Sequence, residues 1–374
     1  MAAVRVAVLG WPKAEVPSTN GSGKSVETRL FINGEFQPSS DGKTFSLIDP
    51  FTQKSVAEGS FPGSLKKAQA MPLQPPKQHS RQGTSSLNTP GYLNMTVKQP
   101  YGVVACIIPW NVPMAFLAFK SALAATLIAK AGFPPDVVNI LSGFGIPAGS
   151  TLASHMDVRC LSFTGSSFTG QRIQAAAAAS NMKIVHMELG GKSPALIFDD
   201  ADLENAAQAT QFSIQCLSGQ TCMANSRIYV QESVADKFLA LFKEKFGSAV
   251  LVNPLESGIT HGPQVDELQY ERVKSYITIG EQDGNLSMGG DAGNGYFIKP
   301  TVFESVPEDS RIMKEEVFGP VVVINTFRTE EEAIKKANAS EFGLYASVFT
   351  NDLDRVAYIE APGSWHCWRQ HYKS

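Results

Sequence analysis

The sequence predicts an α/β fold built on mostly parallel sheets, and three observations carry that prediction. Strand-like and helix-like segments alternate from Tyr101 to Phe246, which is the pattern of sheets covered by helices on both faces. The strand-like segments are apolar, as residues 103–108 illustrate. With 374 residues, 43% of them hydrophobic and 18% charged, the chain is long and apolar enough to form two or three packed units.

The N-terminal region is less regular. Residues 1–27 are rich in Ser, Gly, Lys and Pro and predict a flexible leader, although residues 4–10 resemble the start of a nucleotide-binding strand. Leu30 opens a short strand that is followed by a hairpin turn at Asn33-Gly34. Residues 71–93 show neither the helical nor the strand period, so we expect a long loop there.

From residue 101 onward the elements can be predicted in order. Pro147 favours a helix start, and the helix expected at 234–246 is amphipathic. The expected strands are 103–108, 137–141, 161–163, 183–188, 195–198 and 227–230, and the expected helices are 115–130, 147–154, 168–180, 203–215 and 234–246.

Charge, hydropathy and cysteine content argue against several classes of protein. The net charge is −3 and no basic block is present, so we expect no nucleic-acid partner. No apolar run approaches the length that crosses a bilayer, so we expect no membrane span. Five cysteines without regular spacing argue against a disulfide framework and favour a cytoplasmic protein.

Cys222 is the first candidate for a nucleophile. It lies in Gly219-Gln-Thr-Cys-Met-Ala224, between a predicted helix and a predicted strand. Thiols are intrinsically strong nucleophiles that proteins activate readily near neutral pH. The alternative is a buried, unreactive thiol, which is the commoner state of an intracellular cysteine.

Two polar side chains follow predicted strands and could act with such a nucleophile. Glu188 ends a strand and precedes Leu189-Gly-Gly-Lys-Ser-Pro194, where burial in a cleft would favour a general base. Asn111, in Pro109-Trp-Asn, could donate its amide to a developing oxyanion. The alternatives are a capping or turn glutamate and a simple asparagine turn.

The segment Phe163-Thr164-Gly165-Ser166 joins a predicted strand to a predicted helix. The N–H groups and the positive dipole end of that helix would suit a pyrophosphate. This signal is weaker than a full G-x-G-x-x-G sequence, and many strand–helix turns share it without binding a ligand. Nothing in the sequence implies a metal site.

Five motifs follow one another in a fixed order. They are Pro-Trp-Asn at 109–111, Phe-Thr-Gly-Ser at 163–166, Glu-Leu-Gly-Gly-Lys at 188–192, Gly-Gln-x-Cys at 219–222 and Glu-Glu-Val-Phe-Gly-Pro at 315–320. In this order and spacing the chain closely resembles the aldehyde dehydrogenase superfamily, from about Leu30 to about Ile359. The resemblance implies an α/β protein with a parallel-sheet cofactor-binding domain, an α/β catalytic domain and a residual oligomerisation arm.

The resemblance also implies a role for each matching residue. Cys222 matches the nucleophile, Asn111 and the Cys222 backbone N–H match the oxyanion hole, and Glu188 matches the base that activates water. Glu316 and Phe318 match the pair that holds the nicotinamide ribose and ring. Further cofactor-side positions are Trp110, Lys120, Gly165, Ser166 and, by a weaker match, Gln269.

The implied cofactor is NAD or NADP, and the implied partner is a small-molecule aldehyde. The substrate tunnel would be lined, by position, by Met114, Phe116, Phe212, Gln215 and Cys216. Their apolar character favours an aromatic or aliphatic aldehyde, although core packing explains these residues equally well.

The comparison with the family also sets the expected domain boundaries. Residues 1–27 are the leader, 28–88 and 102–188 the incomplete cofactor-binding domain, and 89–101 the arm; 189–360 are the catalytic domain and 361–374 an aberrant tail. Family segments are missing after Ser60, after Ala125, where the strand with the adenine-ribose contacts is expected, and after Ile359. Translation of residues 71–80 and 364–374 in another frame permits family-like sequences, which indicates mis-splicing, a faulty gene model or a decayed gene.

These departures leave more than one function open. The first is an oxidoreductase that converts an aldehyde to a carboxylic acid with NAD(P)+ through a cysteine thiohemiacetal and thioester. The second is a catalytically defective remnant of such an enzyme, and the third is a thioesterase or esterase that uses Cys222 without cofactor. The family homo-oligomer is doubtful here because its pairing strand near the C-terminus is missing.

Overall fold

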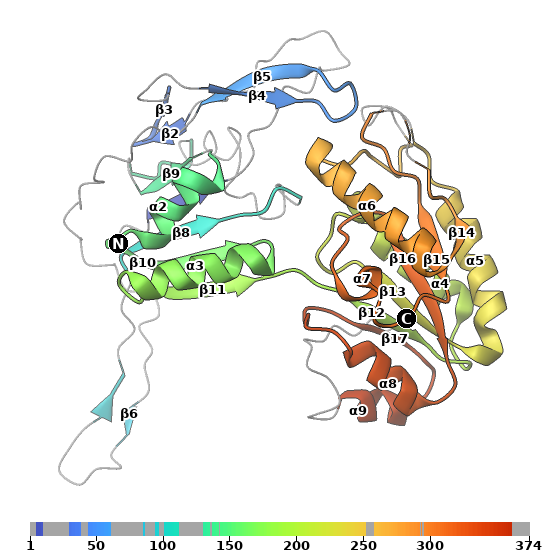
Figure 1. The fold of residues 1–374 in the computed structure, drawn as a ribbon. Helices are drawn as coiled ribbons and strands as arrows, with labels where there is room; N and C mark the ends of the chain where they lie inside the picture. Colours follow the sequence, from blue (N-terminus) through green and yellow to red (C-terminus); the bar gives the residue numbers. More distant parts are fainter. Residues whose placement is uncertain are drawn as a thin grey trace. The chain divides into compact units, whose positions relative to one another are not determined.

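The computed structural model describes residues 5–9, 30–38, 44–60, 85–86, 94–96, 101–111, 130–134, 137–141, 143–251, 258–291, 293 and 295–360. The chain divides into two compact units. Unit 1 comprises Met1–Leu47 and Val56–Glu188, and unit 2 comprises Ile48–Ser55 and Leu189–Ser374. Each unit contains its own sheet (Figure 1), and the division after Glu188 falls at the position where the sequence analysis separates two domains.

Unit 1 is built on a seven-stranded sheet with the order β11-β10-β8-β1-β9-β2-β3. The five strands from β11 to β9 are parallel, and β2 runs antiparallel to both of its neighbours. The strand bounds are β1 Arg5–Leu9, β2 Leu30–Ile32, β3 Glu35–Gln37, β8 Val103–Ile107, β9 Val138–Ile140, β10 Val158–Thr164 and β11 Ile184–Glu188.

The centre of this sheet is a strand from the start of the chain. β1 pairs with β8, with Arg5 opposite Val103, and pairs on its other side with β9, with Val6 opposite Val138. Its sequence, Arg-Val-Ala-Val-Leu, contains the β-branched residues that strands favour. Residues 5–9 therefore differ from the flexible leader expected for 1–27, because their backbone groups are paired on both sides.

The helices of unit 1 follow the predicted order where they are described. A π-helical turn, η2 Gly145–Gly149, leads into α2 Ser150–Ser154, and α3 Ser167–Ala179 lies alongside β10 and β11 (Figure 1). The helix expected at 115–130 lies outside the described residues except for Lys130. Two separate pairs of strands complete the list: β4 Thr44–Ile48 with β5 Ser55–Ser60, and β6 Ser85–Ser86 with β7 Asn94–Met95.

Unit 2 is built on a six-stranded sheet with the order β14-β15-β16-β13-β12-β17. All neighbours are parallel except β14 and β15, which are antiparallel. The strand bounds are β12 Pro194–Ile197, β13 Arg227–Gln231, β14 Asn285–Met288, β15 Thr301–Glu304, β16 Val321–Phe327 and β17 Ser347–Phe349.

Helices cover both faces of this sheet. Because side chains alternate along a strand, Ile228 and Val230 join one buried cluster, and Tyr229 joins another on the opposite face. The first cluster contains residues of α4 Leu203–Gln215 and α5 Ala235–Gly247; the second contains residues of α6 Glu267–Asp283, α7 Arg311–Lys314 and α8 Glu330–Asn338. The remaining helices are η3 Cys216–Gly219, η4 Glu232–Val234 and α9 Leu353–Glu360. The predicted α/β class with parallel sheets is confirmed.

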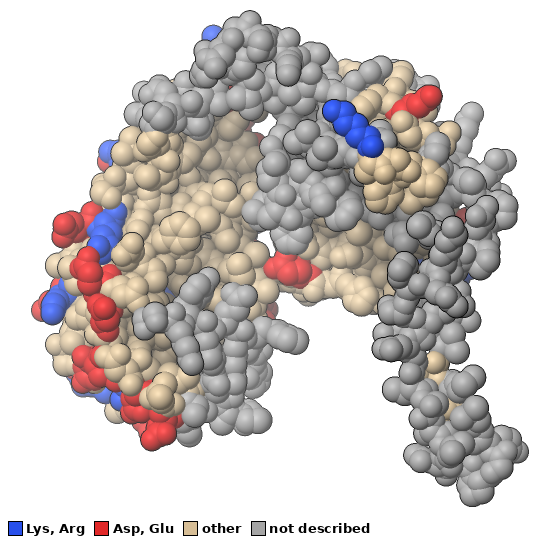
Figure 2. Space-filling model, turned by 180° about the vertical axis from the view of Figure 1, so that it is seen from behind, with Lys and Arg blue, Asp and Glu red and all other residues tan. Residues whose placement is uncertain are grey.

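The surface of the described residues carries charges of both signs. On the face drawn in Figure 2, acidic and basic side chains are interspersed along one edge of unit 2. Several charged side chains of the described residues form ion pairs, for example Arg328 with Glu232 at 2.8 Å. Among the helices in the described ranges, none is both long and apolar enough to cross a bilayer.

Candidate active site

Cys222 lies three residues beyond an unusual turn in unit 2. Helix α4 ends at Gln215, and the next residues form a left-handed turn with φ of 52° at Leu217, 57° at Ser218 and 76° at Gly219. The left-handed conformation costs roughly 1–2 kcal/mol for each residue with a side chain. Such strain collects at functional sites and persists only where the surroundings enforce it.

The Glu-Glu-Val-Phe-Gly-Pro motif packs against this turn. A Cβ placed on Gly219 would overlap the carbonyl group of Gly319 and the nitrogen of Pro320. The positive φ and this close approach of two backbones both require glycine at 219. The first glycine of the Gly-Gln-x-Cys motif is therefore explained by its contact with a motif about a hundred residues further on.

The Leu-Gly-Gly-Lys segment contacts the same stretch of chain at Cys222. A Cβ on Gly191 would overlap the backbone oxygen of Cys222, and one on Gly190 would overlap the carboxylate of Glu316. The Gly191 N–H donates to Glu316 Oε1 at 2.9 Å. Three of the five sequence motifs thus meet around Cys222 within unit 2.

Phe318 is held in a left-handed conformation with φ of 61°. Gln269, on α6, donates Nε2 to the backbone oxygens of Phe318 at 2.8 Å and Val317 at 3.3 Å. Arg272, one helical turn further, donates Nη2 to the backbone oxygen of Glu316 at 2.9 Å. Helix α6 therefore fixes the backbone of the Glu-Glu-Val-Phe-Gly-Pro motif. The side-chain amide of Gln269, which was predicted to contact the cofactor, donates to backbone oxygens of this motif. The sequence analysis gave no role to Arg272, because a helix pattern carries no signal for a carbonyl partner.

Lys192 is buried, with only 2% of its surface exposed. Burial, with a further contribution from the Arg227 guanidinium, lowers the pKa of Lys192 to about 7, and Glu316 acts in the opposite direction. The Arg227 Nε donates to the Lys192 backbone oxygen at 2.9 Å. This amine of low pKa belongs to the residue after Gly191, which contacts the Cys222 backbone; the sequence analysis assigned it no role.

The candidates of unit 1 lie at the carboxyl edge of its sheet. Thr164 is paired with Glu188, and the Gly165 N–H donates to the Glu188 backbone oxygen at 3.1 Å. Ser166 caps α3 by accepting from the Thr169 N–H at 3.3 Å. This edge, where helix N-termini point outward, is where ligands bind in open α/β sheets.

Trp110 and Asn111 follow β8 at the same edge, since Ile107 at the end of β8 pairs with Phe163 of β10. Lys120 lies outside the described residues. The structure therefore places the predicted residues in two groups: Trp110, Asn111, Gly165, Ser166 and Glu188 in unit 1, and Cys222, Gln269, Glu316 and Phe318 in unit 2.

A cavity of about 490 Å³ opens at the end of α4, just before the 217–219 turn. Its wall includes Phe212, Gln215 and Cys216, three of the positions predicted for the substrate tunnel; Met114 and Phe116 lie outside the described residues. The remaining lining residues are polar, so the cavity is less apolar than the sequence suggested: Gln208, Gln211, Lys245, Ser248 and Thr260. Within the described residues, no group of three or more His, Cys, Asp or Glu side chains could hold a metal ion.

Comparisons with known proteins agree with this arrangement. The chain matches the aldehyde dehydrogenase family over residues 54–127 and 118–362. It is 45% identical over 296 residues to an aldehyde dehydrogenase of Davidiella tassiana, covering 72% of this chain and 60% of the relative. It is 46% identical over 295 residues to one of Emericella nidulans, covering 72% and 59%. The fold and the motif cluster thus define an aldehyde dehydrogenase scaffold.

Solved structures give the same result. An aldehyde dehydrogenase of Bacillus cereus superposes with a TM-score of 0.85 and 30% identity, covering 91% of this chain and 87% of that one. An indole-3-acetaldehyde dehydrogenase of P. syringae, solved with NAD+, gives 0.83 and 28%, covering 92% and 88%. The chain belongs to the aldehyde dehydrogenase family. It spans about 60% of the length of the curated relatives.

Proposed function

We propose that this protein is an NAD(P)-dependent aldehyde dehydrogenase that oxidises an aldehyde to a carboxylic acid, with Cys222 as the nucleophile. One observation carries the proposal: the Gly-Gln-x-Cys segment makes two close backbone contacts that require glycine, Gly219 with the Gly319 backbone and Gly191 with the backbone oxygen of Cys222. A structural cysteine would not need two glycine-dependent backbone contacts around it.

The chain's own residues account for the steps on the thiol. The Cys222 thiolate attacks the aldehyde carbonyl carbon, and the carbonyl oxygen becomes an oxyanion. The Asn111 amide and the Cys222 backbone N–H are the proposed donors to that oxyanion, which they would stabilise more strongly than the neutral carbonyl. After oxidation the substrate is a thioester on Cys222. Glu188 is the proposed base that takes a proton from water, whose oxygen replaces the thiol and releases the acid.

The residues present fit a nicotinamide dinucleotide by the chemistry of their groups. Glu316 offers a carboxylate for ribose hydroxyls, Phe318 an aromatic ring for a flat heterocycle, and the N-terminus of α3 a positive dipole end for phosphate. Trp110, Lys120 and Gln269 are further proposed cofactor-side residues. When bound, NAD or NADP supplies the hydride acceptor.

Turnover by the full chain tests this function. Purified protein is mixed with propanal or benzaldehyde and millimolar NAD+ or NADP+, and reduced cofactor is followed by absorbance. We expect turnover that Cys222→Ser removes by a factor of roughly 10³ or more, as for other nucleophiles. Cys160→Ser, at a buried cysteine of unit 1, is the matched control and should leave turnover intact. Turnover that survives Cys222→Ser contradicts the assignment.

A second candidate function is a scaffold that no longer turns over. The two family matches overlap at residues 118–127, beside the place where the ribose-contact segment is missing from the sequence. Titration with NAD+ and NADP+, followed by quenching of tryptophan fluorescence, separates the candidates. Saturable binding at or below millimolar concentration supports the dehydrogenase, and its absence supports the remnant.

We infer further that the protein works in the cytoplasm on a small-molecule aldehyde, without nucleic acid or membrane partners. Residues 89–101 resemble the oligomerisation arm of the family, and this resemblance is the basis for proposing a homo-oligomer. Light scattering of the purified chain, and fractionation of cells that express it, test these two inferences separately.

A further inference from the structure

Residues 260–265 run alongside the left-handed turn that precedes Cys222. The Ser218 hydroxyl donates to the Gly262 backbone oxygen at 2.7 Å and accepts from the Gly262 N–H at 2.8 Å. Gln264, whose side chain is fully buried, donates Nε2 to the Ser218 backbone oxygen at 3.2 Å. Both backbone oxygen and hydroxyl of one strained residue are therefore bonded to the same neighbouring segment.

Gln220 adds a second connection between the same two segments. Its Nε2 donates to the Leu217 oxygen at 2.9 Å and to the Pro263 oxygen at 3.4 Å, while its Oε1 accepts from the Val265 N–H at 2.9 Å. The side chain is buried, with 7% exposed. Because Gln220 bonds forward to 263–265 and back to 217, it closes the turn on itself as well as on its neighbour.

The neighbouring segment is itself anchored in the core. The Gln264 N–H donates to the Tyr296 oxygen at 2.8 Å, and His261 is buried with its Nε2 at 2.8 Å from the Ile298 oxygen. Burial lowers the pKa of His261, and Nε2 is the donor because a carbonyl oxygen only accepts. A segment fixed in this way can hold Leu217 and Ser218 in the left-handed conformation, which they would not adopt without it.

We propose that Ser218 and Gln264 are positioning residues for the nucleophile: their hydrogen bonds keep the 217–219 turn left-handed and so hold Cys222 where it reacts. The inference rests on the proposed function in taking Cys222 as the nucleophile. Without the bonds, the two residues would relax toward right-handed or extended conformations, which are favoured by roughly 1–2 kcal/mol each. Cys222 is only three residues beyond the turn, so its thiol would move with it.

The test measures the reactivity of each thiol in the full chain, which requires neither cofactor nor turnover. Wild type, Ser218→Ala, Ser218→Gly and Gln264→Met are treated with iodoacetamide between pH 6 and 10, and alkylation is quantified by mass spectrometry of peptides. Cys106, a partly buried cysteine of unit 1, is the internal reference. Ser275→Ala is the matched control, since its hydroxyl bonds the Arg272 oxygen on the surface of α6.

We expect Ser218→Ala and Gln264→Met to slow alkylation of Cys222 about tenfold or more relative to Cys106, and to shift the midpoint of its pH profile, because the surroundings of a thiol set its thiolate fraction and hence its reactivity. Ser218→Gly decides the cause, because glycine adopts the left-handed turn without strain but lacks the hydroxyl. Since the hydrogen bonds are proposed to act by holding the left-handed conformation, Ser218→Gly should be alkylated faster at Cys222 than Ser218→Ala. Wild-type reactivity in Ser218→Ala or in Gln264→Met overturns the proposal.

Two further measurements keep the result interpretable. Circular dichroism and thermal unfolding identify a variant that fails to fold, in which case the other two variants decide. In a chain that turns over, kcat should fall with little change in KM, whereas general destabilisation would alter neither in the folded fraction. If Cys222→Ser retains turnover while the variants still alter Cys222 alkylation, the proposed function fails and the positioning role stands.

Discussion

The two sheets of this protein are assembled from very different parts of the chain. In unit 2 the six strands come from one stretch, residues 194–349, and two buried clusters cover the faces of the sheet. In unit 1 the central strand comes from residues 5–9, and its neighbours start at residues 103 and 138. The sheet of unit 2 is therefore formed by one continuous stretch of chain. The sheet of unit 1 depends on a central strand that lies more than 90 residues before its neighbours in the sequence.

This difference shows where each unit is vulnerable. A central parallel strand supplies hydrogen bonds to both neighbours, so its loss exposes backbone groups on β8 and on β9 together. Closing a long loop also has an entropic cost that must be met before the strand contributes. We therefore expect the stability of unit 1 to depend on its N-terminal strand more than unit 2 depends on any single strand.

The largest loss of stability is expected from Ala7→Pro, which disrupts the central strand of unit 1. Proline lacks the N–H and is not accommodated in a central strand. Ala7 is paired with Ala105 on one side and with Asn139 on the other. With several backbone groups stranded at roughly 1–3 kcal/mol each, unit 1 should lose roughly 5 kcal/mol or more, comparable with the whole stability of a domain.

Hydrogen exchange followed by mass spectrometry provides the measurement. Peptides containing residues 103–107 and 138–140 should lose protection in Ala7→Pro, while peptides from unit 2 act as the internal reference. Ala7→Val, which a strand accepts, should behave as the wild type. Undiminished protection of 103–107 in the proline variant would show that unit 1 does not rely on β1.

Lys192 should make the stability of unit 2 depend on pH. The folded pKa is about 7 against an ordinary 10.5, so between these values the unfolded chain binds a proton that the folded chain does not. Stability therefore rises with pH across this window and levels off above it. A difference of about 3.5 pKa units corresponds to roughly 5 kcal/mol.

Urea denaturation of unit 2 at pH 7, 8.5 and 10 in wild type and Lys192→Met measures this slope. Subtracting the free energies of unfolding of the two proteins at each pH removes the contribution of other titrating groups. The difference in stability between Lys192→Met and wild type should become smaller as the pH rises. Lys274→Met is the control, because Lys274 is an exposed residue paired with Glu271 and its removal should leave the rise intact. An identical slope in wild type and Lys192→Met would mean that Lys192 titrates normally in the folded protein.

A matched pair of glycines compares the two units directly. Gly219 of unit 2 and Gly132 of unit 1 have similar positive φ, 76° and 73°. A Cβ on Gly132 would meet nothing within 4 Å, whereas one on Gly219 would overlap the Gly319 backbone. Gly132→Ala should cost only the left-handed penalty of roughly 1–2 kcal/mol, and Gly219→Ala roughly 3 kcal/mol with overpacking added. Thermal unfolding measures the loss of stability in both variants. Equal losses would mean that the 217–219 turn shifts enough to accommodate the added methyl group.

The parts of the fold that sequence could predict are those with local signals. The helices expected at 203–215 and 234–246 are confirmed as α4 Leu203–Gln215 and α5 Ala235–Gly247, since both show an apolar face at helical spacing. The strand expected at 227–230 is confirmed as β13. The central position of Arg5–Leu9 was not predicted, because pairing between residues so far apart leaves no periodicity in the chain.

The candidate site divides in the same way. Cys222 and Glu316 were found because their motifs are short and ordered. Gln264 was missed, since a buried glutamine that bonds a backbone oxygen at residue 218 has no distinctive local sequence. The assignments of Cys222, Glu188 and Asn111 remain predictions, whereas the convergence of the glycine motifs around Cys222 is a property of the fold.

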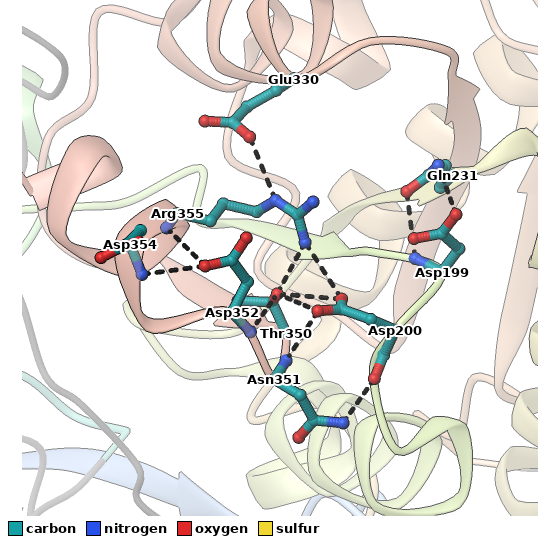
Figure 3. Close-up of polar contacts among 9 residues, drawn as sticks. All are labelled: Asp199, Asp200, Gln231, Glu330, Thr350, Asn351, Asp352, Asp354 and Arg355. Carbon is teal, nitrogen blue, oxygen red and sulfur yellow. Dashed lines mark hydrogen bonds and ion pairs between the residues drawn. The ribbon is translucent and has the colours of Figure 1, made fainter.

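The smallest expected effect concerns the end of unit 2, where Arg355 of α9 joins β12 and β17. Its Nη1 donates to Asp200 Oδ1 at 3.1 Å and to Thr350 at 2.8 Å, its Nε donates to Glu330 at 3.1 Å, and its guanidinium lies 4.3 Å from the Phe198 ring centroid. Figure 3 shows the Arg355 side chain between Glu330 on one side and Thr350 and Asp200 on the other. The Arg355 side chain is 21% exposed, against 76% for Arg328 in its surface pair with Glu232.

Arg355→Ala should therefore cost unit 2 roughly 2 kcal/mol, because several partly buried charge-assisted bonds and an aromatic contact are lost together. Arg328→Ala should cost less than about 1 kcal/mol, as solvent and salt screen an exposed pair. Arg355→Lys keeps the charge but loses the planar fork that reaches two partners, so it should fall between the two. Denaturant midpoints at low and high salt measure all three. Equal losses for Arg355→Ala and Arg328→Ala would mean that β17 and α9 are held by apolar packing instead, and that the edge of the unit 2 sheet needs no polar closure.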